Sequence, residues 1–168
     1  VFHELAHQVA YVRDDSTFNE SFAAVVEEAG VARWIAAQSG TPAHARLAAE
    51  QARGERLRGL FRRLVRDARA ELAAVYASDV PDAAKRARKA QVFAAMGAAY
   101  EAAKAGEAGL AGYDRWFAGH DGRGPNNASL AAAALYDEKV PVLRGLLDRA
   151  GGDLPQFYAE VRELAKQP

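Results

Sequence analysis

The pentapeptide His3-Glu4-Leu5-Ala6-His7 places two imidazoles and one carboxylate at a spacing that suits metal-activated hydrolysis. Residues four apart lie one turn above each other on the same face of an α-helix, so His3 and His7 can bind a single metal ion. Glu4 lies one step round the helix, within reach of a water molecule on that metal. The pattern therefore predicts a zinc site in which Glu4 is the general base.

The composition restricts both the ligands and the partners of such a site. The chain has no cysteine, which excludes disulfides and thiolate ligands and leaves His, Asp and Glu as zinc ligands. Its 22 basic and 22 acidic residues give a formal net charge of +0, which favours neither nucleic acid nor an anionic membrane surface as a partner. No apolar run approaches the roughly 18 residues of a membrane-spanning helix. The 168 residues, 50% of them hydrophobic, suffice for one core, and we predict a single domain over residues 1–168.

A catalytic zinc site needs a third protein ligand and one open position for water. Glu20 is the best candidate, because twelve residues separate it from His7. That spacer allows the first helix to end near Arg13, turn through residues 14–17 and return antiparallel. Glu20 would then face both histidines.

The acidic residues of this second helix have alternative interpretations. Thr17 and Glu20 also have the spacing of a capping box, in which the glutamate satisfies amides at the helix start. Glu27 lies seven residues beyond Glu20 on the same helical face, where it could accept a hydrogen bond from the far nitrogen of a ligand histidine. Beside Glu28, it equally fits a solvated helix face.

The rest of the chain has the apolar periodicity of helices, with Pro and Gly near their ends. No alternation typical of β-strands is present. We expect an ordered loop, rich in glycine and aromatic residues, over 106–127. The predicted fold class is all-α, with the HExxH helix followed by the ligand helix and a multi-helix bundle. The expected helices after the first span about 18–37, 42–77, 81–105, 128–135, 142–150 and 155–165.

Two segments of the chain resemble a known group of enzymes. HELAHQ at residues 3–8 and NESFA at residues 19–23 are similar to the zinc site of the glutamate-zincin metallopeptidases, in which a NEGFA-type helix provides the third ligand. A fuller resemblance, to a bacterial family described as putative aminopeptidases, extends to residues 113–117, 126–128 and 151–155. It implies a zincin-like helical catalytic half, Glu20 as zinc ligand and a peptide substrate. It also points to the bacterial cell envelope.

The motif lies almost at the first residue of the chain. Only Val1 and Phe2 precede His3, which leaves the start of the predicted helix without a capping side chain. We therefore expect this chain to be the carboxy-terminal part of a longer metallopeptidase. Part of the substrate cleft would then lie in the preceding region.

The resemblance also implies a donor for the oxyanion, since glutamate-zincins often use a Tyr or His for this role. Our candidate is Tyr136, which lies in the late helical region that would close over the site. It follows Asn126 and Asn127, whose amides could hold the backbone of a substrate. The other residues of these types that we considered are Tyr11, Tyr76, Tyr100, Tyr113, Tyr158 and His120.

Two functions are consistent with these residues. The first is zinc-dependent hydrolysis of a peptide bond, with aminopeptidase action expected from the resemblance. The alternative is a catalytically silent helical binding module, or an inactive fragment, in which zinc contributes only to folding. The predicted cofactor is Zn²⁺, bound by His3, His7 and Glu20.

Overall fold

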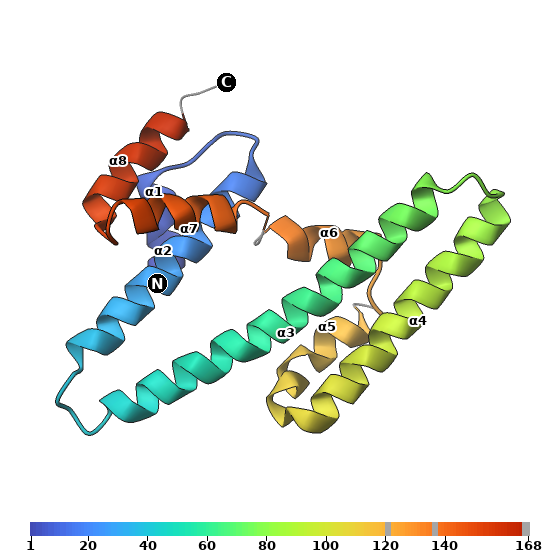
Figure 1. Cartoon of the computed structure of the whole chain (residues 1–168), viewed down its shortest axis with the longest axis horizontal. Coiled ribbons are helices and arrows are strands. Elements are labelled where there is room, and N and C mark those ends of the chain that lie inside the picture. Colours follow the sequence, from blue (N-terminus) through green and yellow to red (C-terminus); the bar gives the residue numbers. More distant parts are fainter. Residues whose placement is uncertain (120–121, 136–137, 166–168) are drawn as a thin grey trace. The chain divides into compact units, whose positions relative to one another are not determined.

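The computed structural model describes residues 1–119, 122–135 and 138–165, and this part of the chain is helical, without a β-strand (Figure 1). The predicted all-α fold class is therefore confirmed. No helix in the described part is long and apolar enough to cross a membrane. The elements are α1 (Phe2–Val9), α2 (Ser16–Ala37), α3 (His44–Ala77), α4 (Asp82–Gly106), the 3₁₀-helix η1 (Ala108–Tyr113), α5 (Asp114–Ala118), α6 (Asn127–Leu135), α7 (Val140–Arg149) and α8 (Leu154–Leu164).

Backbone contacts group the chain into two compact units. Unit 1 comprises Val1–Ala49 and Ala134–Pro168, and unit 2 comprises Glu50–Ala133. The boundaries lie within α3 and α6. The single domain over residues 1–168 stays a prediction.

Helix α2 is the central element of unit 1. It carries apolar residues on most of its surface because α1, α7 and α8 contribute to the same core. Phe22 and Phe157 are fully buried there, with ring centroids 5.8 Å apart. Burial of one such side chain contributes about 1.5–3 kcal/mol, so this core holds α2 against its neighbours.

Helix α1 runs antiparallel to α2 and approaches it closely at Gly30. A Cβ atom at this position would lie 2.7 Å from Cγ of Phe2. Only glycine therefore allows the aromatic ring at the start of α1 to pack on α2. This contact helps to fix the position of α1, which carries both histidines, on α2.

Replacement of Gly30 by alanine is expected to destabilise the protein by about 1–3 kcal/mol, because the ring of Phe2 must move. Gly97, in the interior of α4, is the matched control, since a Cβ atom there meets nothing within 4 Å. Gly97→Ala should stabilise by about 0.4–1 kcal/mol. Urea denaturation of both variants tests the difference. A Gly30→Ala variant as stable as Gly97→Ala would contradict it.

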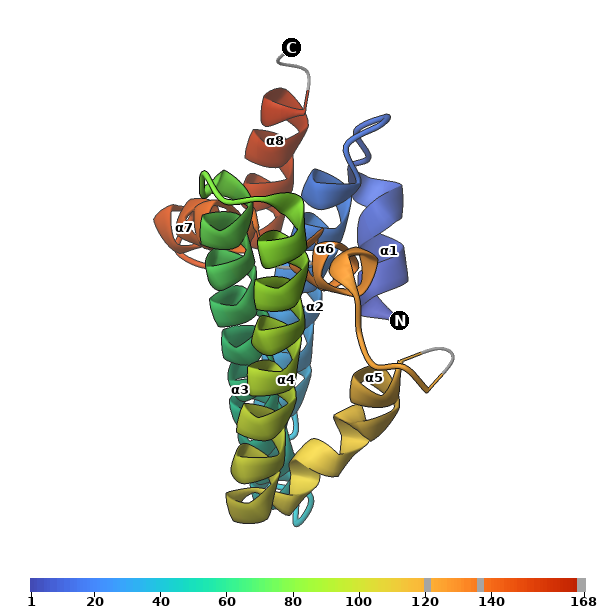
Figure 2. The same ribbon diagram turned by 90° about the vertical axis from the view of Figure 1, so that its right-hand side faces the viewer.

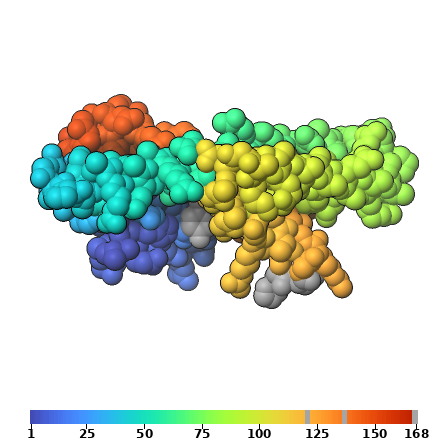
Figure 3. All heavy atoms as spheres, turned by 90° about the horizontal axis from the view of Figure 1, so that it is seen from below, coloured from blue at the N-terminus to red at the C-terminus, as the bar shows by residue number. Residues whose placement is uncertain are grey.

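Unit 2 is built on α3 and α4, which lie side by side in Figures 1 and 2 and form a continuous surface in Figure 3. Val65 and Leu72 of α3 are buried in one cluster with Val92 and Met96 of α4. The remaining faces of these helices are largely exposed. They carry many of the charged side chains of the chain.

The loop predicted over residues 106–127 is wrong for residues 108–118, which form η1 and α5. Tyr113, Trp116 and Phe117 have the spacing of one helical face and pack around Phe61. Phe117 also stacks on the buried Tyr100, with ring centroids 3.7 Å apart. Aromatic packing thus orders a segment whose glycines indicated a loop.

Tyr100 anchors this segment by a hydrogen bond as well. Its hydroxyl lies 2.6 Å from Oδ1 of Asp114 and 2.9 Å from the carbonyl oxygen of Leu110. Burial, followed by the neighbouring carboxylate of Asp114, raises the pKa of Tyr100 to about 12. Lys104 bonds the same carboxylate at 2.7 Å, and this bond is the main reason that the pKa of Asp114 is lowered.

The other helices begin and end within two residues of their predicted bounds, with the exception of the first. Helix α1 ends at Val9 and not near Arg13. The backbone N–H and C=O of Val12 both bond to the side chain of Asn19, so they cannot join the helical ladder. A polar side chain of α2 thus shortens α1.

Candidate metal centre

The facing surfaces of α1 and α2 bring His3, His7 and Glu20 together. One ligand atom from each side chain lies within 4.8 Å of the other two. The carboxylate of Glu20 is 3.2 Å from Nε2 of His3 and 3.7 Å from Nε2 of His7. The side chains of His3, His7 and Glu20 are 21%, 22% and 24% exposed. The cluster is therefore partly buried but still accessible to water.

The donor set fits a zinc ion. Zinc binds imidazole nitrogen and carboxylate oxygen at about 2.0–2.2 Å in tetrahedral geometry, which places ligand atoms about 3.4 Å apart. The separations of 3.2 Å, from Oε2 of Glu20 to His3, and 3.7 Å, from Oε1 of Glu20 to His7, are of this order. Calcium and magnesium prefer sites made of oxygen atoms alone. Two imidazoles therefore favour zinc.

Glu27 lies on the other side of His3. Its Oε2 atom is 3.3 Å from Nδ1 of His3, while Nε2 of the same ring faces Glu20. A carboxylate at Nδ1 selects the tautomer whose Nε2 lone pair is free for a metal. The Nδ1 atom of His7 is buried and has no hydrogen-bond partner within the described residues. The two histidines thus differ at Nδ1, because in the part of the chain that the structure describes only that of His3 lies beside a carboxylate.

The capping-box interpretation of Glu20 is wrong. Helix α2 begins one residue before Thr17, and its N-cap is Asp15, whose side chain accepts the N–H of Phe18 at 2.8 Å. The pKa of Asp15 is lowered mainly by its hydrogen bond from Lys139 and secondly by this capping bond. Because Asp15 already caps the helix, the side chain of Glu20 is available to the histidines.

Two buried polar residues flank Glu20, and the sequence analysis assigned no role to either. Asn19 is 2% exposed, and its amide bonds the N–H and the C=O of Val12, each at 2.8 Å. The hydroxyl of Ser21 donates to the carbonyl of Leu135 and accepts the N–H of Lys139, both at 3.2 Å. The sequence offered one signal for these roles, which is the position of both residues close to Phe22 in the NESFA segment. Polar residues buried beside an aromatic residue need hydrogen-bond partners inside the fold.

Among the other predicted site residues, Glu4 is not one of the three clustered side chains. Glu4 is exposed on α1, and Tyr136 lies outside the described residues. Asn126 and Asn127 belong to unit 2, where Asn126 accepts the N–H of Ser129 and Asn127 donates to the hydroxyl of Tyr76. His120 also lies outside the described residues. Asn126 and Asn127 therefore each have a hydrogen-bond partner within unit 2.

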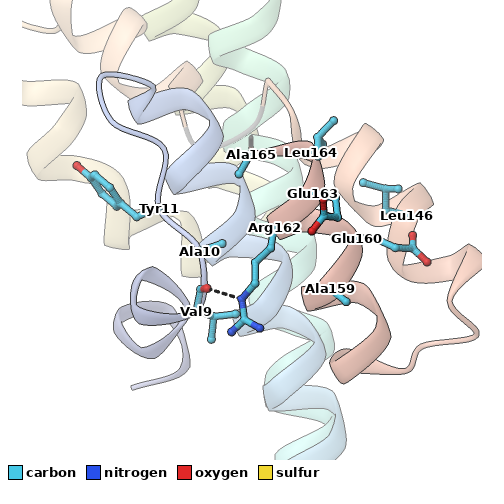
Figure 4. Close-up of a pocket in the computed structure, with 10 residues that line it drawn as sticks. All are labelled: Val9, Ala10, Tyr11, Leu146, Ala159, Glu160, Arg162, Glu163, Leu164 and Ala165. Atoms are coloured by element: carbon cyan, nitrogen blue, oxygen red, sulfur yellow. Dashed lines mark hydrogen bonds between the residues drawn. The ribbon is translucent and has the colours of Figure 1, made fainter. Parts of the chain in front are cut away.

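A groove of about 950 Å³ lies beside the end of α1 in unit 1 (Figure 4). Tyr11 lies at this groove, and its ring centroid is 6.4 Å from that of His7. Arg162 of α8 donates to the carbonyl of Val9 at 3.0 Å and so satisfies a free carbonyl at the end of α1. The lining residues are Val9, Ala10, Tyr11, Leu146, Ala159, Glu160, Arg162, Glu163, Leu164 and Ala165.

The helical framework and the His-His-Glu cluster define an all-α protein with a candidate metal centre. The whole chain, residues 1–168, matches the model of the family described as "Putative aminopeptidase". The chain therefore belongs to this family, and the predicted resemblance to it is confirmed. No curated protein and no solved structure matches the chain significantly. The description of the family points to a peptidase.

Proposed function

We propose that this chain carries the zinc centre of a metallopeptidase that hydrolyses peptide bonds, with aminopeptidase action as the expected specificity. The observation that carries the proposal is the convergence of His3, His7 and Glu20 within 4.8 Å. Membership of the family supports a peptide substrate. The glutamate-zincin subclass belongs to the same proposal.

In the proposed mechanism, different residues bind the metal, transfer the proton and orient a ligand. When bound, zinc supplies Lewis acidity, which polarises the scissile carbonyl and lowers the pKa of the attacking water to about 7. Glu4 accepts the proton of that water and transfers it to the leaving amine. His3, His7 and Glu20 hold their donor atoms towards one point, and Glu27 orients the ring of His3.

The developing oxyanion requires a hydrogen-bond donor. Tyr136 remains our candidate from the sequence. Tyr11 is a second candidate, because its ring contacts that of His7 and its side chain is largely exposed. Asn126 and Asn127 remain candidates for holding the substrate backbone.

Mass spectrometry of the metal content, on the wild type and on Glu20→Ala, is the direct test. We expect about one zinc per wild-type chain and a strongly reduced content in the variant, since the alanine removes one of three ligands. Glu28→Ala is the matched control, because Glu28 is also on α2 but pairs with Arg144. A wild type that takes up no zinc, or equal contents in wild type and Glu20→Ala, would contradict the proposed site.

The alternative is a catalytically silent module in which the same metal contributes only to folding. A metal ion held by His3, His7 and Glu20 would link α1 to α2, and a link of this kind stabilises a fold even without catalysis. Zinc uptake without hydrolysis of any peptide would support this alternative.

A further inference from the structure

The connection between α1 and α2 determines how the two histidines meet Glu20. Within it, Asp14 adopts a positive φ of 64°, which marks a tight reversal of the chain. The amide of Asn19 bonds both backbone groups of Val12 in this connection. Because the N–H of Val12 needs an acceptor and its C=O a donor, these two partners also fix the orientation of the amide.

Asn19 is one residue before Glu20 and lies in the same turn of α2. The turn that presents the Glu20 carboxylate to the histidines therefore also holds the chain that leads from His7. The side chain of Asn19 is buried, 2% exposed, so both bonds are protected from competition by water. Any shift of the connection relative to α2 must break at least one of them.

Other anchors of α1 act further from the third ligand. Phe2 packs on Gly30 at the start of the helix, and Arg162 bonds the carbonyl of Val9 at its end. Neither involves the turn of α2 that carries Glu20. The Asn19 clamp, defined as the two bonds between Asn19 and Val12, joins this turn to the connection, beside the capping bond between Asp15 and Phe18.

We propose that Asn19 is a positioning residue of the metal centre, which sets the distance between the histidine pair and Glu20 through its clamp on Val12. This inference rests on the proposed function, since it takes His3, His7 and Glu20 as ligands of zinc. Loss of a residue that supports ligands commonly weakens metal affinity by about 10–100-fold. We expect an effect of this size from Asn19→Ala, although all three ligands remain.

The test compares zinc dissociation constants of the wild type, Asn19→Ala and Ser21→Ala, measured by competition with a chromophoric chelator. Ser21 is the matched control, because it is buried, adjoins Glu20 and also makes two hydrogen bonds, but with Leu135 and Lys139. Asn19→Ala should bind zinc about 10–100-fold more weakly, and Ser21→Ala should bind it about as tightly as the wild type. Thermal melts of the metal-free proteins report the structural cost of each change.

A second readout is the visible spectrum of the Co²⁺-loaded proteins, which reports the coordination geometry. We expect Asn19→Ala to alter the wild-type spectrum and Ser21→Ala to preserve it. Asn19→Ser, too short to reach both groups of Val12, provides a second variant with the same expected loss. Zinc affinity unchanged in either Asn19 variant would overturn the inference, as would an equal loss in Ser21→Ala or a failure of both Asn19 variants to fold.

The outcomes for the inference and for the proposed function are distinguishable. A wild type without zinc affinity would reject the proposed metal centre and the inference with it. A wild type that binds zinc, together with Asn19 variants that bind it equally well, would reject only the positioning role.

Discussion

Replacement of Glu4 by glutamine is expected to lower peptide hydrolysis by about 10²–10⁴-fold while the zinc content stays that of the wild type. Glutamine has nearly the shape of glutamate but cannot accept the proton of the attacking water. The side chain is exposed and is not one of the three clustered ligands, so the metal should remain bound. Steady-state kinetics with aminoacyl and peptide substrates, and metal analysis of the same samples, measure the two effects.

The same change at a carboxylate of unit 2 provides the control. Glu55 lies on α3, in unit 2, and bonds Gln51 of the same helix. Glu55→Gln should leave hydrolysis unchanged. The loss in Glu4→Gln should fall on kcat, because proton transfer occurs only in the transition state. A zinc-loaded Glu4→Gln variant with wild-type activity would reject Glu4 as the base.

The core of the candidate site could be predicted because it depends on local geometry. His3 and His7 share a helical face through their spacing, and Glu20 follows after a spacer long enough for one reversal. The structure brings these three side chains together as predicted. Glu27 was open to two interpretations, and its carboxylate is found 3.3 Å from His3. Periodicity alone could not distinguish a solvated face from one that meets α1.

The residues that the sequence analysis missed act through tertiary contacts. Asn19 bonds a backbone seven residues away in a connection with no regular pattern, and Ser21 bonds backbone groups of Leu135 and Lys139 more than a hundred residues away. Neither partner can be identified from spacing. The end of α1 was misplaced for the same reason, since the Asn19 side chain competes with the helical ladder at Val12.

The error over residues 106–127 has a different origin. The glycine and aromatic residues of this segment predicted an ordered loop, because glycine weakens helices. The spacing of Tyr113, Trp116 and Phe117 indicated a helical face, and Phe61 and Tyr100 provide the surface on which it packs. Tertiary burial outweighed the local preference of the glycines. The aromatic residues pack in the core of unit 2.

Replacement of His7 by alanine is expected to remove most of the stabilisation that zinc provides. A ligand that binds only the folded state stabilises it by RT ln(1 + [L]/Kd), about 4.1 kcal/mol at a free zinc concentration a thousand times Kd. Removal of a ligand should weaken binding by at least about 100-fold, the upper end of the effect of losing a supporting residue. The same zinc concentration is then at most about ten times Kd, and the stabilisation falls to about 1.4 kcal/mol or less.

The corresponding measurement is thermal unfolding with and without zinc. For a chain of this size, 1 kcal/mol shifts the melting temperature by about 2–4 °C, so the wild type should gain about 8–16 °C and His7→Ala at most about 3–6 °C. His44 is the matched control, because its Nδ1 atom lies 3.0 Å from the carbonyl oxygen of Ile35 and it is not part of the cluster. His44→Ala should keep the full zinc-dependent gain, and an equal loss in both variants would contradict the assignment of His7 as a ligand.

The zinc-dependent gain also separates the two functions when it is measured in Glu4→Gln. A peptidase should keep the whole gain in this variant and lose hydrolysis, because Glu4 acts on the water and does not hold the metal. A structural zinc module should keep the gain and show no hydrolysis even in the wild type. Loss of the gain in Glu4→Gln would mean that the Glu4 carboxylate supports the metal. This result would contradict the assignment of Glu4 as a base that does not hold the metal.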